Sequence, residues 1–347
     1  MKIAVLVSGG VDSSVALSLL KQQNHELTAF YLKIWLEDEL SFLGTCPWQE
    51  DLKYVEAVCN KLDVPLKVLS LQKEYWDNVV SYTIREIKAG RTPNPDMMCN
   101  QIIKFGLFYK KIDKSFEKIA TGHYAQLKKI KDKYHLFRSP DPVKDQTYFL
   151  ADLTEQQLSR ALFPIGKYKK DEVRKLAYKL NLPNKDRKDS QGICFLGQIK
   201  FKEFVKHHLG EKKGDVIEYE SRKKVGNHVG CWFFTIGQRR GLALGHGPWY
   251  VVKKDIKKNI VYVSNRFEKL EKERSSFKVG NFNWINKPKK KNLLVKIRHG
   301  PKLYKCVINF KGNYAEVKIK GRDQGIAPGQ FAVFYDGREC LGLVLIR

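Results

Sequence analysis

The first twenty residues, MKIAVLVSGGVDSSVALSLL, constrain the fold more than any other stretch of the chain. Ile3 to Val7 is a short apolar run, which predicts a buried strand. Gly9 and Gly10 follow at once, and the stretch from Ser14 to Leu20 then has helical spacing of apolar residues. A strand that turns through glycines into a helix presents free backbone N–H groups at the positive end of the helix dipole. This arrangement predicts an anion site suited to phosphate.

The loop itself reads SGGVDS, from Ser8 to Ser13. It lacks the lysine and the spacing of a Walker A loop, and it is not the dinucleotide-binding G-x-G-x-x-G pattern. It resembles the PP-loop of the ATP pyrophosphatases, which split ATP into AMP and pyrophosphate. Ser13 and Ser14 add hydroxyl groups, and Asp12 could hold a magnesium ion. The alternative is an ordinary strand-to-helix turn, in which Gly, Asp and Ser are common residues.

Strands alternate with helices through the first 125 residues, which predicts an α/β fold with a parallel sheet covered on both faces. The expected strands cover 27–35, 66–71 and 118–120, and the expected helices cover 51–62 and 74–88. One more helix is expected further along, over 169–180. Ligands of such sheets bind at the carboxyl ends of the strands. Gly9 and Gly122 both follow strands, so we expect them to meet one nucleotide.

After about residue 210 the pattern changes to short strands, many glycines and tight turns. Four segments read as strands of a small β-barrel, namely 295–298, 304–310, 315–319 and 331–335. The run KPKKK from Lys287 to Lys291 reads as an exposed linker or tip.

The charge balance points to a polyanionic partner. Among 347 residues, 64 are Lys or Arg and 37 are Asp or Glu, which gives a formal net charge of +27. Nucleic acid is the simplest such partner, because its phosphates bind Lys and Arg with release of counterions. A lysine-rich genome is the alternative explanation. We expect neither a signal peptide nor a membrane helix.

Seven cysteines without the spacing of a disulfide framework indicate a reducing, cytoplasm-like compartment. Cys99 lies in GRTPNPDMMCNQ, where two prolines predict an extended loop and Asp96 precedes the thiol by three residues. Cys194 lies in DSQGICF, which we also expect to be a loop. The remaining cysteines are predicted to be small core residues, with Cys46 the least certain: Cys46, Cys59, Cys231, Cys306 and Cys340.

Motifs along nearly the whole chain, in order, resemble those of the tRNA-specific 2-thiouridylases, which place sulfur on the wobble uridine of certain tRNAs. The matching pieces are SGGVDSS, GRTPNPDMMCN, ATGHY, KDQTYFL, DSQGICF, TIGQRRGL, PWYVV and PGQFAVFYDGRECLG. The resemblance implies a PP-loop (HUP-like) domain over 1–205, a small β-rich domain that contacts tRNA over 206–272 and a C-terminal β-barrel over 273–347.

The resemblance also implies roles for individual residues. Cys99 is the expected nucleophile, Cys194 the expected persulfide carrier, and the two are expected to form a disulfide. The expected ATP contacts are Leu6, Val7, Ser8, Gly9, Gly10, Val11, Asp12, Ser13, Leu32 and Gly122. The expected tRNA contacts are Asn94, Pro95, Asp96, Lys144, Asp145, Gln146, Arg298 and His299.

Two positions depart from the family pattern. Leu32 stands where the family often has Met beside the adenine, and His299 stands where an aromatic residue commonly follows Arg298. The first exchange is conservative, whereas the second weakens the expectation of an RNA contact there.

The chemistry of 2-thiolation requires these groups. The C2 oxygen of uridine is a poor leaving group until ATP adenylates it, and Mg²⁺ is expected to accompany ATP. A persulfide on Cys194, loaded by a donor protein, then supplies sulfur; Cys99 resolves the persulfide, which leaves a disulfide or releases sulfide. Nearby Lys and Arg would favour the thiolates, and Asp96 is a candidate general base.

Two other functions remain open at this point. One is a different PP-loop ligase, such as an amide-forming synthetase, which would need neither paired cysteines nor excess positive charge. The other is a tRNA-binding protein in which the nucleotide site is only structural. Release of pyrophosphate that depends on tRNA would separate the thiouridylase from the binding protein.

Overall fold

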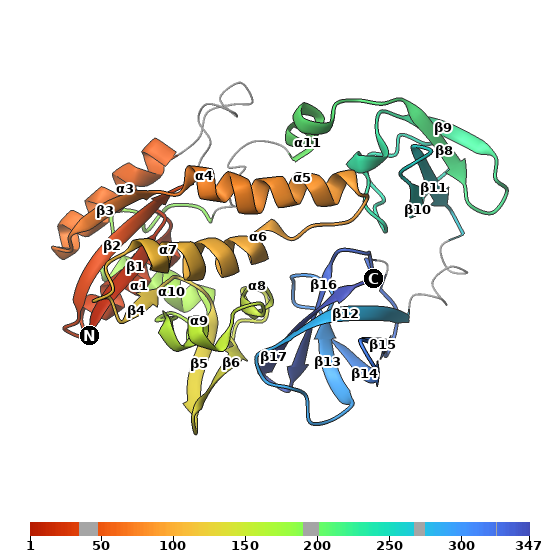
Figure 1. The fold of residues 1–347 in the computed structure, drawn as a ribbon. Helices are drawn as coiled ribbons and strands as arrows, with labels where there is room; N and C mark the ends of the chain where they lie inside the picture. The colour runs from red at the N-terminus through yellow and green to blue at the C-terminus, as the bar shows by residue number, and fades with distance from the viewer. Residues whose placement is uncertain (35–47, 190–200, 267–274, 324) are drawn as a thin grey trace.

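A computed structural model describes residues 1–34, 48–189, 201–266, 275–323 and 325–347 (Figure 1). The chain forms an α/β domain, then a small β-rich domain, then a closed barrel, which confirms the predicted fold class. No helix within the described ranges has the length and apolar character needed to cross a bilayer.

The first domain is built on a five-stranded parallel sheet with the order β3-β2-β1-β4-β7. Its central strand is β1, whose residues after Lys2 are all buried, because the sheet is covered on both faces. The strand bounds are β1 Lys2–Val7, β2 Glu26–Lys33, β3 Leu66–Ser70, β4 Lys118–Ala120 and β7 Ala161–Leu162.

The strand order reverses direction between β1 and β4, which are neighbours with Val5 opposite Ala120. In open α/β sheets, ligands bind beside the carboxyl ends of strands at such a switch point. The loop after β1 and the glycine after β4 therefore meet where a ligand is expected.

The predicted helices of the first domain are present, but the structure adds helices over 95–111, 147–150 and 155–160 that were not predicted. The segment predicted as one helix over 74–88 runs from Gln72 to Lys88 and widens into a π-helical turn over Trp76–Val80. The helix bounds are α1 Val11–Lys21, α3 Trp48–Leu62, α4 Gln72–Tyr75, η2 Trp76–Val80, α5 Ser81–Lys88, α6 Pro95–Met98, η3 Cys99–Leu107, α7 Phe108–Lys111, α8 Thr147–Leu150, α9 Glu155–Arg160 and α10 Lys170–Lys179.

The middle domain has a four-stranded sheet with the order β10-β11-β8-β9, entered through helix α11. Its elements are α11 Phe201–Leu209, β8 Gly214–Glu218, β9 Lys224–His228, η4 Cys231–Phe233, β10 Tyr250–Asp255 and β11 Ile260–Ser264. A core of its own, which includes Trp249 and Val251, holds this sheet together.

The C-terminal domain is a six-stranded antiparallel barrel, closed because β12 pairs with both β15 and β17. Alternate residues of its strands point into a separate apolar core. The bounds are β12 Ser276–Trp284, β13 Asn292–Lys296, β14 Tyr304–Lys311, β15 Tyr314–Ile319, β16 Phe331–Asp336 and β17 Glu339–Ile346.

A hairpin of the first domain joins the barrel sheet. Strands β5 (Ala125–Ile130) and β6 (Lys133–Arg138) pair with each other, and β6 pairs with β17 through Leu136 and Cys340. The hairpin and β17 lie side by side in Figure 1. The two domains therefore share one hydrogen-bonded sheet, which the sequence patterns did not predict.

Candidate active site

The loop between β1 and α1 has the geometry of an anion site. Gly9 adopts a left-handed backbone with φ 74°, and Gly10 precedes the helix without a side-chain cap. The Ser13 hydroxyl donates to the Gly10 carbonyl at 3.0 Å and accepts from the Ser8 N–H at 3.2 Å, which fixes the turn. The first N–H groups of an eleven-residue helix are thereby presented to a ligand.

Neighbouring segments press closely against this loop. A Cβ on Gly9 would lie 2.7 Å from the Asp51 carbonyl oxygen and 2.8 Å from the Arg187 guanidinium. A Cβ on Gly122 would lie 2.7 Å from the Ser13 nitrogen. Only glycine allows these approaches, so Gly122 contacts the start of α1. Its contact with a nucleotide stays a prediction.

The Asp12 carboxylate is held by two donors. The Tyr124 hydroxyl and the Lys170 ammonium both lie 2.7 Å from its Oδ1 atom. Burial, followed by the negative charge of Asp12, raises the pKa of the Tyr124 hydroxyl above its ordinary value, so this phenol stays a donor.

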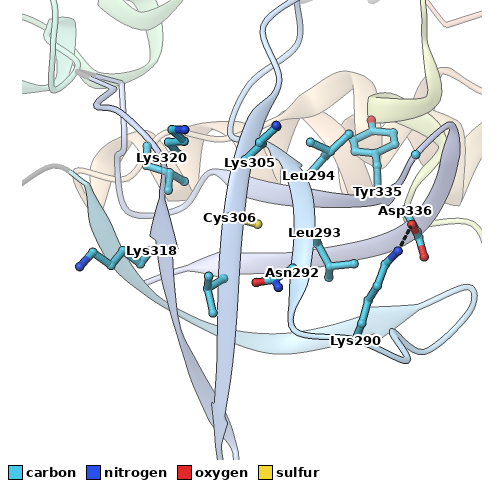
Figure 2. A pocket seen from close by; sticks show the side chains of 13 residues that line it. Lys290, Asn292, Leu293, Leu294, Lys305, Cys306, Lys318, Lys320, Tyr335 and Asp336 are labelled. Atoms are coloured by element: carbon cyan, nitrogen blue, oxygen red, sulfur yellow. Dashed lines mark ion pairs between the residues drawn. The ribbon is translucent and has the colours of Figure 1, made fainter.

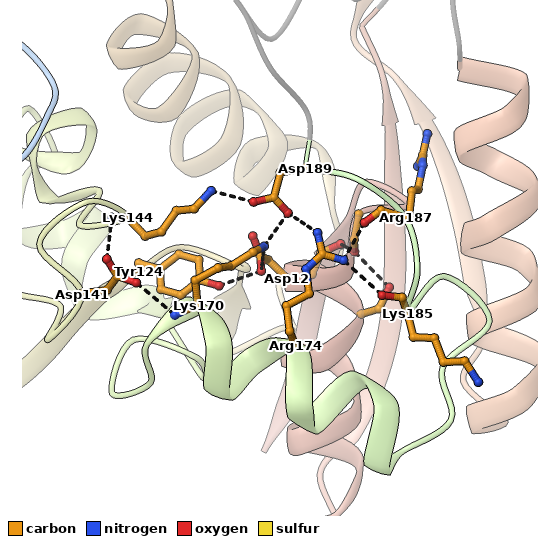
Figure 3. Close-up of polar contacts among 12 residues, drawn as sticks. Asp12, Tyr124, Asp141, Lys144, Lys170, Arg174, Lys185, Arg187 and Asp189 are labelled. Atoms are coloured by element: carbon orange, nitrogen blue, oxygen red, sulfur yellow. Dashed lines mark hydrogen bonds and ion pairs between the residues drawn. The ribbon is translucent and has the colours of Figure 1, made fainter.

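Asp189 lies at the centre of a cationic cluster. Its carboxylate pairs with Lys170 at 2.7 Å, with Lys144 at 2.6 Å, and with Arg174 (Figure 3). Burial opposes ionisation of this carboxyl, but the hydrogen bonds to Lys144 and Lys170 outweigh burial and hold its pKa below the ordinary value. Lys170 thus bridges the loop residue Asp12 and Asp189.

The segment Lys144–Gln146 links three parts of the molecule. Lys144 reaches Asp189, and the Gln146 side chain accepts the Tyr124 N–H at 2.9 Å. Asp145 is buried and pairs with Lys296 of the barrel at 2.8 Å. The side chain of Asp145 is therefore occupied inside the protein.

Comparison with known proteins identifies the family to which the chain belongs. Three family models match in order: a tRNA methyl transferase HUP domain over residues 1–198, a tRNA methyl transferase PRC-barrel domain over 202–265 and an aminomethyltransferase β-barrel domain over 274–346. The tRNA-specific 2-thiouridylase MnmA of Parabacteroides distasonis is 46% identical over 354 residues, with 100% of this chain and 99% of the relative covered. The chain belongs to the tRNA-specific 2-thiouridylase family.

Two further relatives carry the same description. One, MnmA 2 of Bacteroides fragilis, is 46% identical and covers 99% of each chain. The other, MnmA of Porphyromonas gingivalis, is 44% identical over 97% of this chain and 96% of the relative.

In this thiouridylase-family chain, Cys99 lies in a helix, so the extended loop predicted around it is wrong. The loop ends at Asn94, whose side chain accepts the Met97 N–H at 3.1 Å and caps the helix. Pro95 occupies the first turn, where its missing N–H has no cost, and the helix continues through η3 and α7 to Lys111. Cys99 is buried, and Asp96 lies three residues earlier on the same helix face.

The structure brings Asn94 towards the segment that follows Gln146. Helix α6, which Asn94 caps, contacts α8, and the Tyr148 hydroxyl of α8 donates to the Phe331 carbonyl at 3.0 Å. The start of the Cys99 helix therefore lies beside the helix that follows the Lys144–Gln146 segment. Cys194 lies outside the described residues, so its distance from Cys99 stays a prediction.

The two barrel residues expected to contact tRNA lie apart from the ATP loop. Arg298 donates to both carboxylate oxygens of Asp323, at 2.8 and 2.9 Å. The His299 ring stacks on Phe149 with 4.5 Å between ring centroids, and burial followed by the charge of Lys296 lowers its pKa. Leu32 lies in β2 and packs against the main core.

Cys59, Cys231, Cys306 and Cys340 are buried, which confirms their prediction as core residues, and Cys46 lies outside the described residues. Burial raises the pKa of the Cys59 thiol to about 11 and that of Cys306 to about 12. These thiols are poor nucleophiles at neutral pH, in contrast to what sulfur transfer requires.

Sequence reasoning missed several residues that surround the loop. Asn184 is buried and donates to the Gly9 carbonyl at 2.7 Å and to the Ser14 hydroxyl at 2.9 Å. The others are Asp51, Tyr124, Lys170, Arg174 and Arg187. The sequence position indicated a place near the loop only for Tyr124, which lies two residues after Gly122 in the segment that follows β4. The other residues are brought to the loop by tertiary packing.

A separate groove of about 580 Å³ lies on the barrel (Figure 2). Its rim carries four lysines, and its walls include apolar side chains of β13 and β14 such as Leu294 and Val307. The lysines are Lys290, Lys305, Lys318 and Lys320, of which Lys290 pairs with Asp336 at 2.7 Å. This groove is suited to an anionic partner.

Proposed function

We propose that the chain is an ATP-dependent tRNA-uridine 2-sulfurtransferase that converts the wobble uridine to 2-thiouridine. The loop after β1 binds the phosphates of ATP, and the C2 oxygen of uridine attacks the α-phosphate. Pyrophosphate leaves, and the base then carries AMP as a leaving group at C2. The base must leave its stack to reach these groups.

One observation carries this proposal: Lys170 joins Asp12 of the phosphate loop to Asp189. Asp189 opens the DSQGICF motif, in which Cys194 follows five positions later. Asp189, the first residue of the motif to which we assign sulfur transfer, is therefore joined through Lys170 to the loop to which we assign adenylation. That placement suits a reaction in which sulfur attacks the adenylated carbon.

Sulfur transfer follows adenylation of the base. The terminal sulfur of a Cys194 persulfide attacks C2, and AMP departs. The Cys99 thiolate attacks the inner sulfur, which leaves a Cys99–Cys194 disulfide and the sulfur on the base. A dithiol reductant then restores both thiols with two electrons. In the alternative order, Cys99 first releases the sulfur as sulfide, and sulfide attacks C2.

Partners follow from this chemistry. The substrate is tRNA, and a persulfide-bearing donor protein loads Cys194. Within the described ranges, no three His, Cys, Asp or Glu side chains gather into a metal site. Mg²⁺ is commonly held by one or two carboxylates together with substrate phosphates, and Asp12 is a carboxylate that fits this role. The ion would neutralise phosphate charge.

The test is mass analysis of nucleosides from tRNA incubated with the protein, ATP and a persulfide source. We expect 2-thiouridine, with pyrophosphate release that depends on tRNA. Binding of tRNA without pyrophosphate release would favour a tRNA-binding protein, and pyrophosphate release without thiolation would favour another PP-loop ligase.

A further inference from the structure

A fully buried ion pair connects the barrel to the first domain. Lys296 closes strand β13, and its ammonium lies 2.8 Å from the Asp145 carboxylate. Both side chains are 0% exposed. Removing two charges from water is costly, and apolar residues at such positions often give equal or greater stability. A contribution to stability alone therefore does not explain why two charged residues occupy this buried position.

Asp145 is held on every side. Its Oδ1 atom accepts the Thr147 hydroxyl at 2.9 Å, and its Oδ2 atom accepts both Lys296 and, at 3.2 Å, Arg138. The Tyr335 hydroxyl of the barrel lies 3.2 Å from that of Thr147. These contacts hold the backbone of Asp145 in place. They therefore also set the positions of the adjacent residues, Lys144 and Gln146.

Those neighbours lead directly to the proposed active site. On one side, Lys144 contacts Asp189 at 2.6 Å. On the other side, Gln146 holds the Tyr124 backbone, and Tyr124 donates to Asp12 of the phosphate loop. A displacement of Asp145 would therefore move two separate contacts of the site at once.

We propose that Lys296 is a positioning residue for the reaction: through Asp145 it sets Lys144 and Gln146, so that the barrel is part of the catalytic geometry. This inference rests on the proposed function. The domain interface has other contacts that do not need the ion pair, including the Tyr148 hydroxyl on the Phe331 carbonyl at 3.0 Å and the pairing of β6 with β17.

The test compares Lys296→Met with Lys278→Met, an exposed lysine on the same barrel. At saturating ATP and tRNA, we expect the rate of pyrophosphate release to fall about tenfold or more in Lys296→Met, because small misplacements of catalytic groups have effects of this size. The matched control should keep the wild-type rate. Affinity for tRNA, measured by filter binding, should change less than about threefold, since the basic surface is retained.

A double variant, Asp145→Asn with Lys296→Met, separates positioning from stability. Lys296→Met leaves the Asp145 carboxylate with Arg138 as its charged partner, and Asp145→Asn removes the carboxylate that pairs with Lys296. Each single variant should lower the melting temperature, whereas the double variant should recover much of it. We expect turnover to stay low in the double variant. Recovery of turnover together with the melting temperature, or wild-type turnover in Lys296→Met, would overturn the inference. Absence of thiolation by the wild-type protein would instead contradict the proposed function.

Discussion

The Tyr124 hydroxyl donates a hydrogen bond of 2.7 Å to the carboxylate of Asp12, a residue 112 positions earlier in the chain. Tyr124 ends the short loop between β4 and β5, and Asp12 lies in the first turn of α1, so the hydrogen bond joins these two elements. It also orients the carboxylate beside the helix terminus at which phosphates are expected. The Asp12 side chain is therefore placed by the sheet's switch point and not by its own loop alone.

Replacing this tyrosine tests that placement. Tyr124→Phe should lower kcat/KM for ATP by roughly tenfold, because a hydrogen bond to a charged group contributes about 1.5–3 kcal/mol. Binding of tRNA should not change. The measurement is tRNA-dependent pyrophosphate release, with the barrel variant Tyr314→Phe as control. An unchanged kcat/KM would show that the contact has no role in ATP use.

Substitutions in the phosphate loop should abolish adenylation. Gly9→Val forces a branched side chain onto a φ of 74° and against the Asp51 carbonyl oxygen, and Asp12→Ala removes the carboxylate. We expect no pyrophosphate release from either variant and nearly normal tRNA binding. Gly245→Val is the control, since nothing lies within 4 Å of its added Cβ. Normal release by either loop variant would contradict the nucleotide assignment.

The net charge of +27 predicts a steep salt dependence of tRNA binding. Affinity should fall by roughly three decades between about 50 and 200 mM salt if some six phosphates are contacted. Exchanging Lys305, Lys318 and Lys320 for Glu should lower the slope of log affinity against log salt if RNA occupies the barrel groove. A flat response of the wild-type protein would mean that the charge reflects composition alone.

The two family cysteines should fail at different steps. Cys194→Ser should carry no persulfide when a donor is supplied, whereas Cys99→Ser should accept the persulfide and stop before turnover. Wild-type protein with tRNA and without reductant should accumulate a Cys99–Cys194 disulfide, found by peptide mapping. The bond requires α-carbons about 4.4–6.8 Å apart.

Cys306→Ala is the control for the thiols, because burial raises the pKa of Cys306 to about 12 and keeps it unreactive. Thiolation of tRNA by Cys194→Ser, or a disulfide between Cys99 and another cysteine, would show that the assigned roles are wrong.

Local pattern predicted the parts of the fold that depend on local physics. The run from Ile3 to Val7 is buried on both sides, so a continuous apolar stretch identified the central strand. The glycine turn predicted the sharp loop after β1, because few residues other than glycine tolerate its backbone and its close contacts. Alternation of apolar residues predicted β13, β14, β15 and β16 of the barrel, but β12 and β17, which close it, were not predicted.

The rest depended on contacts between distant segments. The β5–β6 hairpin reads as a lysine-rich polar stretch, yet its two strands pair with each other and β6 also pairs with β17 of the barrel. Lys170 and Arg187 looked like ordinary basic surface residues until packing brought them to the loop. Around Cys99, the prolines suggested an extended chain, but Pro95 at the first helical turn is compatible with a helix, and Asn94 supplies the cap.

The shared sheet has a consequence for anyone who dissects this protein into pieces. A fragment that ends before β12 would leave β6 as an open edge, with Leu136 uncovered where β17 now pairs. Open edges recruit strands from other molecules and lead to aggregation. The same fragment would expose the buried charge of Asp145. We therefore expect a fragment that lacks the barrel to be insoluble, so that the barrel is needed for soluble expression of the rest of the chain.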